Sequence, residues 1–494
     1  MQTYITNEAE LAKRSQKNSS TFSAVLIAGL LHAVVAAALA FWYLAGAEEP
    51  EPDLIIQAPI GNSTAKVQSK DFSTVMKETP AASSSQMSKL ITAKSAVSNV
   101  VIPAVPDMAV DTLDLGVGFG DGFGLGMGGS GSGTGGFPPP GSPMSDRCNA
   151  KDRAERLEKE GGTPATEEAV VQALAWLAKE QNRDGSWGSG HRVAMTGLGL
   201  LAFLGHCETY DSPQYGENVR KAVQYLAEKA LNDEGRLRAR QGHSWVYEHG
   251  IGTYAICEAY SLLKYGRKKF PQMSELKEAI GLAIPIIIKG QNPGGGWLYD
   301  YDVSLTDKGG SNQKGDTSVV GWQMQALKAA SLTGLEFDGI SKSIKNGIEF
   351  LRSVQGTKGG FGYRTAGDKY SLTGVGALCQ QIFRSGRHRS VRDAVDFILQ
   401  HDFQIGSDEA CLYGWYYNAQ ACFQRGGSDW RKWNKMFRDP VVNAQKPDGS
   451  WPFEGGTVDS QTSKAAGADA PIYRTCLFTL MLEVYYRYLP ATEK

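Results

Sequence analysis

Four side chains of this 494-residue sequence are the candidates for acid–base chemistry. Asp300 and Asp302 form a closely spaced acidic pair, Asp316 follows them, and His249 follows Tyr-Glu. Carboxyl and imidazole groups are the usual general acids and bases of enzymes. Each group also has an ordinary interpretation: a solvated turn for the acidic pair, a helix N-cap for Asp316, and a helix-end hydrogen bond for His249.

A motif that recurs along the chain indicates how these side chains are positioned. In each copy, Gly follows Gln by four residues and an aromatic residue follows Gln by six; the copies are Gln181–Trp187, Gln291–Trp297, Gln355–Phe361 and Gln445–Trp451. The segment 231–237 keeps the spacing and Gly235 but has neither the Gln nor the aromatic residue. A fixed motif between helix-like segments indicates a repeat architecture.

From about Thr163 onward the apolar residues follow a helical period. An amphipathic segment is followed each time by a more uniformly apolar one, which indicates an outer and an inner layer of helices. The six predicted pairs are 164–181 with 193–204, 219–231 with 254–263, 276–288 with 319–330, 344–354 with 372–382, 391–403 with 411–423, and 430–444 with 472–488. Six such pairs can close into an all-α, (α/α)6 toroid, which has no exposed ends to cap.

The repeated motif has a structural role on physical grounds. The Gly can take a positive φ where a helix stops, and the Gln amide can bond free backbone groups at helix ends. The aromatic ring then packs over the turn. The motif therefore predicts architecture more strongly than chemistry.

The chain before residue 164 has three parts. Residues 1–21 are polar and carry three basic residues, and residues 22–46 form an apolar run without charge that is long enough to span a bilayer. Basic residues before the span favour a cytoplasmic N-terminus, which predicts a single-pass inner-membrane protein with residues 164–490 outside the cytoplasm. Cleavage at Ala45-Gly-Ala47, as in a signal peptide, is the alternative. Residues 47–163, rich in Gly and Pro toward their end, predict a disordered linker.

Charge and cysteine content exclude some classes of function. The formal net charge of −1 gives no electrostatic basis for nucleic-acid binding. The seven Cys form no CxxC pair and have no regular spacing, so neither a zinc ribbon nor a disulfide framework is expected. Buried thiols are the ordinary interpretation.

The Gln-x3-Gly-x-Trp copies resemble the repeats of the squalene–hopene cyclase and protein prenyltransferase superfamily (prenyltransferase/squalene oxidase repeats). The resemblance covers residues 164–490. Two stretches, 315–322 and 484–490, resemble bacterial repeat-containing relatives. The resemblance implies an α/α toroid with a central cavity and, if the protein is catalytic, chemistry of the terpene cyclase or prenyltransferase type.

The motifs that perform this chemistry are incomplete here. Class II cyclases use Asp-x-Asp-Asp-Thr, whereas this chain reads Gln313-Lys-Gly-Asp-Thr317, which keeps only Asp316. Prenyltransferases hold zinc through Asp, Cys and His; Glu409 and Cys411 resemble the first two ligands, but Arg474 stands at the position of the His. An Arg cannot replace a neutral imidazole as a ligand, so we expect no metal, and no other cofactor motif is present.

Three functions remain open. The first is a membrane-anchored, exported toroid that binds an isoprenoid-like ligand or a peptide in its cavity; the second is a cyclase or transferase that uses other acids; the third is an envelope scaffold. The expected ligand contacts are Glu248, Trp322, Arg364, Trp415, Tyr416 and Arg474. Because inner helices would point their N-termini to one end, near Arg364 and Arg474, we expect that end to favour an anionic group.

Overall fold

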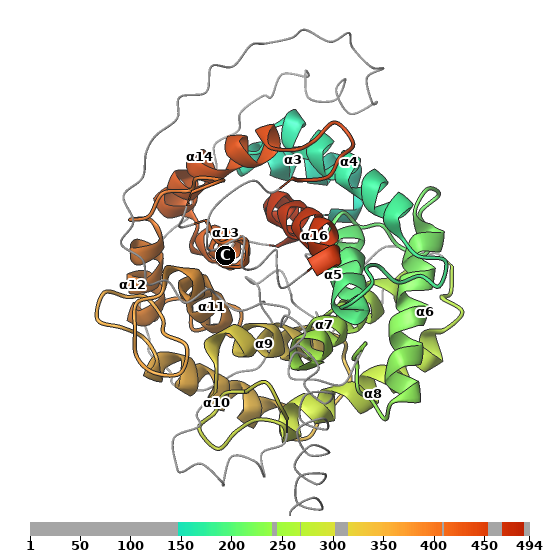
Figure 1. Ribbon diagram of the computed structural model, residues 1–494, viewed down its shortest axis with the longest axis horizontal. Helices are drawn as coiled ribbons and strands as arrows, with labels where there is room; N and C mark the ends of the chain where they lie inside the picture. Colours follow the sequence, from blue (N-terminus) through green and yellow to red (C-terminus); the bar gives the residue numbers. More distant parts are fainter. Residues whose placement is uncertain are drawn as a thin grey trace, which may run out of the picture. The chain divides into compact units, whose positions relative to one another are not determined.

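The structure, a computed structural model, describes residues 147–239, 245–266, 268–301, 315–407, 410–452 and 467–488, which belong to one compact unit. Within them the chain alternates between outer and inner helices (Figure 1). The outer helices are α4 (Pro164–Glu180), α6 (Gly216–Asn232), α8 (Met273–Lys289), α10 (Ile340–Ser353), α12 (Arg389–Ile398) and α14 (Gly427–Asn443). The inner helices are α5 (Arg192–Gly205), α7 (Trp245–Leu263), α9 (Thr317–Leu332), α11 (Tyr370–Gln381), α13 (Leu412–Arg425) and α16 (Ala470–Leu482).

The two layers differ in burial as the apolar pattern predicts. Almost every residue of inner helix α7 is buried, whereas outer helix α10 buries one face only. Each inner helix contacts the next, from α5 through α7, α9, α11 and α13 to α16, and α16 returns to α5. In the outer layer α14 contacts α4. The predicted all-α class is confirmed, and these contacts close the six pairs into a double ring.

Asp469 ties the last inner helix to the first. It ends the short 3-10 helix η4 (Gly467–Asp469) directly before α16. Its carboxylate accepts hydrogen bonds from the backbone N–H groups of Ser189 (2.6 Å), Gly190 (3.0 Å) and His191 (2.8 Å), and from the Ser189 hydroxyl (3.0 Å). These donors immediately precede α5, and charge-assisted bonds are the stronger kind. One carboxylate thus spans the junction between the two ends of the repeat array.

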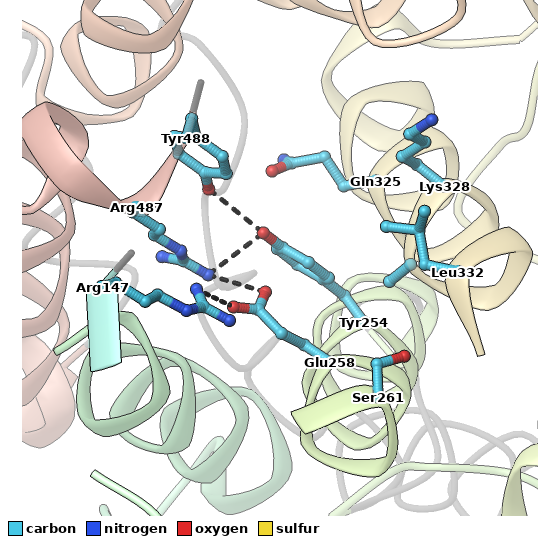
Figure 2. A pocket seen from close by; sticks show the side chains of 10 residues that line it. Arg147, Tyr254, Glu258, Ser261, Gln325, Lys328, Leu332, Arg487 and Tyr488 are labelled. Atoms are coloured by element: carbon cyan, nitrogen blue, oxygen red, sulfur yellow. Dashed lines mark hydrogen bonds and ion pairs between the residues drawn. The ribbon is translucent and has the colours of Figure 1, made fainter. Parts of the chain in front are cut away.

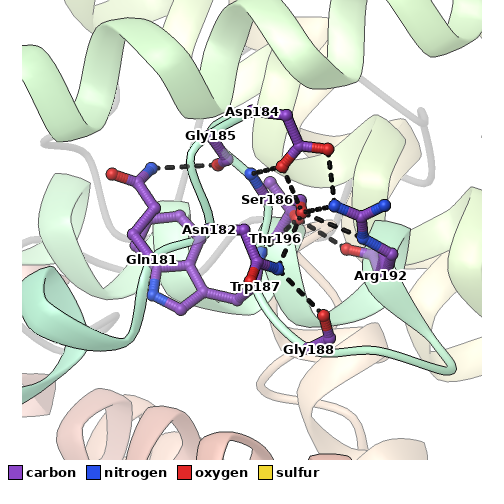
Figure 3. A network of polar contacts seen from close by, with 9 residues as sticks. All are labelled: Gln181, Asn182, Asp184, Gly185, Ser186, Trp187, Gly188, Arg192 and Thr196. Carbon is purple, nitrogen blue, oxygen red and sulfur yellow. Dashed lines mark hydrogen bonds and ion pairs between the residues drawn. The ribbon is translucent and has the colours of Figure 1, made fainter.

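The Gln of each repeat joins neighbouring outer helices. In all four copies its amide nitrogen donates to the carbonyl of the motif Gly and to a carbonyl near the start of the next outer helix. Figure 3 shows the Gln181 bond to Gly185. The inter-repeat bonds run from Gln181 to Asn218 (2.9 Å), Gln291 to Ser343 (2.8 Å), Gln355 to Ser390 (2.9 Å) and Gln445 to Ala169 (2.8 Å). The last of these crosses the closure from α14 to α4.

The motif Gly and Trp complete the same junction. The Gly residues have positive φ, for example 92° at Gly449, and lie so close to the next outer helix that a Cβ there would meet the Gln172 carbonyl oxygen at 2.3 Å. The Trp indoles donate to carbonyls in the last turn of the preceding outer helix, as in Trp187 to Leu177 at 2.7 Å. The predicted structural role of the motif is confirmed, with one refinement: the Gly permits close approach between repeats rather than stopping the helix.

Two expectations about the segment before α4 are wrong. The linker was predicted to run to residue 163, but Ala150–Lys159 forms helix α3, which Asn149 caps and which contacts α17 (Val484–Arg487). The expectation that the chain has no disulfide framework is also wrong, because Cys148 pairs with Cys207. Apolar periodicity misses α3 because the helix is mostly polar and buries only Arg153 and Leu157. The other five cysteines are buried thiols, as expected.

Two further predictions concern the end of the chain and the membrane. The predicted helix 472–488 is divided at Glu483 into α16 and α17. No helix in the described part of the chain is long and apolar enough to cross a bilayer. The predicted span 22–46 and most of the predicted linker lie outside the described residues.

The connections at the two ends of the inner helices differ in length. Those that lead into inner helices are long, such as residues 290–316 before α9 and 444–469 before α16. Those that leave inner helices are short: α14 begins directly after α13, at the single residue Gly426.

Candidate functional site

Asp316 is the N-cap of α9, as the sequence predicts. One carboxylate oxygen accepts bonds from the Ser318 backbone N–H (3.0 Å) and hydroxyl (2.6 Å), and the other accepts one from the Tyr299 hydroxyl (2.9 Å). The Arg364 Nε lies 3.7 Å from the second oxygen, on a side chain that is 52% exposed. Both oxygens are therefore committed to structural bonds at the start of α9.

We expect Asp316→Ala to lower the free energy of unfolding by about 1–2 kcal/mol, since it removes a helix cap and leaves buried donors unpaired. Asp316→Asn should cost only a few tenths, because an amide oxygen caps about as well and the Tyr299 hydroxyl can accept from the amide nitrogen. Urea denaturation of the three proteins measures this. Equal losses in the two variants would contradict the capping role.

His249 has a structural environment. Its Nδ1 accepts from the Leu237 backbone N–H (3.1 Å) and its Nε2 donates to the Ala283 carbonyl (3.1 Å). Burial lowers the pKa of this imidazole to about 3, so it is neutral at physiological pH. The adjacent Glu248 accepts a bond from the Ala239 N–H and lies 3.5 Å from His191 Nδ1. Both side chains hold the start of α7 against its neighbours.

The other predicted site residues are dispersed. Asp300 is exposed, and Asp302 and Glu409 lie outside the described residues. Arg474 is partly buried on α16 and has contacts of its own. Among the acid–base and arginine candidates, Asp316 and Arg364 lie close together. The roles of these residues toward a ligand stay predictions.

The predicted aromatic contacts belong to the interior of the ring. The rings of Trp322 and Tyr416 stack with centroids 5.4 Å apart, and the Tyr416 hydroxyl donates to Gln325 (3.1 Å). Trp415 packs against Phe403 at 4.1 Å between centroids. Trp322 and Tyr416 therefore pack between inner helices α9 and α13, whereas Trp415 packs against Phe403, which follows outer helix α12.

A pocket lies at the opposite end, where the inner helices finish (Figure 2). It is lined by Arg147, Tyr254, Glu258, Ser261, Gln325, Lys328, Ala329, Leu332, Arg487 and Tyr488. The cavity volume is about 20 Å³, more than the roughly 10–15 Å³ that one water requires. The enclosed part therefore takes only the end of a larger ligand.

Two buried arginines share one carboxylate in this pocket. Arg147 donates to one oxygen of Glu258 and Arg487 to the other, each at 2.9 Å, and Arg487 also donates to the Tyr254 hydroxyl at 3.1 Å. Burial alone would raise the pKa of Glu258, but Arg487 and Arg147 outweigh it and lower that pKa. Glu258 is therefore ionised, and the three groups together carry one net positive charge.

Lys328 is the unusual titratable group of this pocket. It is buried on α9, and its ammonium nitrogen lies 5.6 Å from the centre of the Phe383 ring. Burial, with a smaller contribution from Arg384, lowers the pKa of this amine to about 7. A buried Lys without a carboxylate partner among the described residues is uncommon.

Next to the pocket, His206 belongs to a buried group of charges. Its ring nitrogens face Glu167 (3.0 Å) and Glu208 (2.9 Å), and Arg153 also bonds Glu167. Burial alone would lower the pKa of His206, but hydrogen bonds to the two carboxylates raise it to about 9. The ring is therefore charged at neutral pH.

This raised pKa predicts a pH dependence of stability. The stabilisation from charged His206 is complete below its unfolded pKa of about 6.5 and is lost as pH rises toward 9. Between those values the free energy of unfolding should fall in the wild type more steeply than in His206→Gln. Denaturant titrations at intervals across this range measure the two slopes; identical slopes would contradict a charged His206.

No group of three or more His, Cys, Asp or Glu side chains in the described ranges could hold a metal ion. The sequence reasoning missed Arg147, Glu258, Lys328 and Arg487. A polar residue inside an otherwise apolar helix, such as Glu258 or Lys328, was the available signal. Nothing in the sequence indicated that these residues meet.

No family model matches this chain, and no curated protein matches it. Solved structures of the type II terpene cyclase MstE from Scytonema are similar to it in part. The complexes with merosterolic acid A and with geranylgeranyl dihydroxybenzoate are each 13% identical, cover 68% of this chain and 99% of theirs, and give TM-scores of 0.43. Similarity at this identity and TM-score carries no argument about this chain. The ring described above rests on the contacts between the chain's own helices.

Proposed function

We propose that this protein is an exported, membrane-anchored binding protein whose helical ring holds an apolar ligand, isoprenoid-like or peptide, by one end. The observation that carries the proposal is the pocket at the C-terminal ends of the inner helices. Leu332, Ala329 and the rings of Tyr254 and Tyr488 give it an apolar wall, and polar side chains stand beside that wall. Concave apolar sites with a few convergent polar groups are the usual form of ligand sites.

The arrangement favours binding over catalysis. Both oxygens of Asp316 accept hydrogen bonds from neighbouring side chains or backbone, and both ring nitrogens of His249 are bonded to backbone. A general acid needs a proton that it can present to the substrate. These two groups serve the fold instead, which leaves cyclase-type chemistry without an evident acid among the described candidates.

The proposed location outside the cytoplasm has independent support. The Cys148–Cys207 disulfide belongs to a class of bond that persists in oxidising compartments and is rare in the cytosol. Residues 22–46, with basic residues before them, supply the apolar run expected of an anchor. Alkaline washing of membranes should leave the full-length chain in the pellet; a soluble product beginning near Glu48 would contradict the anchor.

The experiment that tests the function is mass spectrometry of apolar compounds extracted from protein purified from its own membranes. We expect a compound that co-purifies with the wild type and is lost in Leu332→Glu, which places a charge on the apolar wall. Val171→Glu is the matched control, since Val171 is an exposed apolar residue on outer helix α4. Equal recovery from all three proteins would contradict binding at this pocket.

A further inference from the structure

We infer that the ligand carries an anionic head group, which Arg147 and Arg487 bind at the C-terminal ends of the inner helices. This inference rests on the proposed function and names the chemical class of the ligand: an organic anion, such as a carboxylate or phosphate monoester, attached to an apolar chain. The sequence alone predicted an anion at the end of the ring near Arg364 and Arg474. The inference places the anion at the opposite end.

Unsatisfied donors are the first observation. Both guanidinium groups are at least 98% buried, with 2% of Arg147 and 1% of Arg487 exposed. Arg147 Nε and Nη2, and Arg487 Nε and Nη1, have no hydrogen-bond partner within the described part of the chain. Buried N–H groups are normally bonded, and each unpaired one is unfavourable. An anion with several acceptor oxygens is the kind of group that satisfies such donors.

The charge balance is the second observation. Glu258 is one carboxylate between two guanidiniums. A second buried carboxyl, Glu483, also interacts with both arginines, but burial raises its pKa well above the usual range and favours its neutral form, so one positive charge remains among these groups. The C-terminal ends of α7 and α9 contribute only partial negative charge. Lys328, on the pocket wall, is 4% exposed and adds positive charge whenever it is protonated. An isolated positive charge in a buried site is unfavourable, and an anion neutralises it.

The position of Arg147 is the third observation. Figure 2 shows Arg147 and Arg487 approaching Glu258 from neighbouring elements, with Tyr254 and Tyr488 beside them. Arg147 precedes Cys148, whose disulfide to Cys207 fixes it after the end of α5. Arg153 also donates to the Arg147 carbonyl at 2.9 Å. The backbone at Arg147 is therefore fixed without the use of its guanidinium donors, which is the preorganisation expected of a binding group.

The test is calorimetric titration of the full-length protein, in neutral detergent, with hexanoate and with 1-hexanol. We expect hexanoate to bind at least tenfold more tightly than hexanol, and more tightly than acetate. Arg147→Met should weaken hexanoate binding at least tenfold, because it removes one guanidinium. Glu258→Gln should strengthen it severalfold, because it removes the competing carboxylate; a purely structural role for these residues would not increase affinity.

Arg389→Met, at an exposed arginine of outer helix α12, is the matched control and should leave hexanoate affinity unchanged. Arg364→Met tests the other end of the ring, where the sequence predicted the anion. Thermal melts confirm that each variant is folded, and Glu258→Gln remains decisive if Arg147→Met does not fold. Equal affinity for hexanoate and hexanol, or a loss of binding in Arg364→Met alone, would overturn the anion site while the proposed apolar binding stands. Failure of both probes to bind would overturn the proposed function as well.

Discussion

Replacing Gly449 with alanine should destabilise the ring by about 2–5 kcal/mol. The φ of 92° is unfavourable for any residue with a Cβ, which costs about 1–2 kcal/mol, and overpacking adds about 1–3 kcal/mol. The new methyl would lie 2.3 Å from the Gln172 carbonyl oxygen on α4. Because Gly449 follows the last outer helix and Gln172 belongs to the first, the substitution forces apart the two ends of the repeat array. Urea denaturation of the wild type and variant measures the loss.

Gly281→Ala is the matched control for this prediction. Gly281 lies in the exposed face of α8, and a Cβ there would meet nothing within 4 Å. The same chemical change should therefore stabilise by about 0.5–1 kcal/mol, because Ala is the better helix former. If Gly449→Ala is neutral or stabilising like Gly281→Ala, the close approach of the turn at Gly449 to α4 is wrong.

Removing the disulfide, with Cys148→Ser and Cys207→Ser together, should cost about 2–5 kcal/mol. The two residues are 59 apart in sequence, so the bond restricts a long loop of the unfolded chain. It also holds the segment that carries Arg147 against the end of α5. Thermal melts with and without reductant measure the effect.

The serine double variant provides the control. A reductant should lower the melting temperature of the wild type toward that of the double variant and should leave the double variant unchanged. An equal response of the two proteins to reductant would contradict a disulfide in the folded protein, and with it the support that the bond gives to an exported domain.

The ring was predictable because its information is local and repeated. Each Gln-to-aromatic copy fixes one junction, and Gln445 makes to Ala169 the bond that Gln181 makes to Asn218, so the last copy closes the array with the same chemistry. The Asp316 cap was predictable for the same reason: a cap depends on a few adjacent residues.

The pocket and the disulfide were not predictable because they depend on distant partners. Arg147 and Arg487 belong to the two ends of the described chain and meet only at Glu258. Cys148 lies beside a polar helix that has little apolar periodicity, and Cys207 follows α5 at a site without any cysteine motif. The spacing of residues predicts contacts within one segment of the chain. These contacts join distant segments and form only when the ring is closed.

The most direct test of binding without catalysis is to incubate the full-length protein with geranylgeranyl phosphate, remove unbound ligand, extract the protein and analyse the extract by chromatography and mass spectrometry. We predict that the ligand is retained by the wild type, is lost in Arg147→Met, and is returned with unchanged mass and retention time. A cyclised isomer, with the same mass and a new retention time, would contradict this account and establish the chain as an enzyme. Failure of the wild type to retain the ligand would contradict the proposed binding.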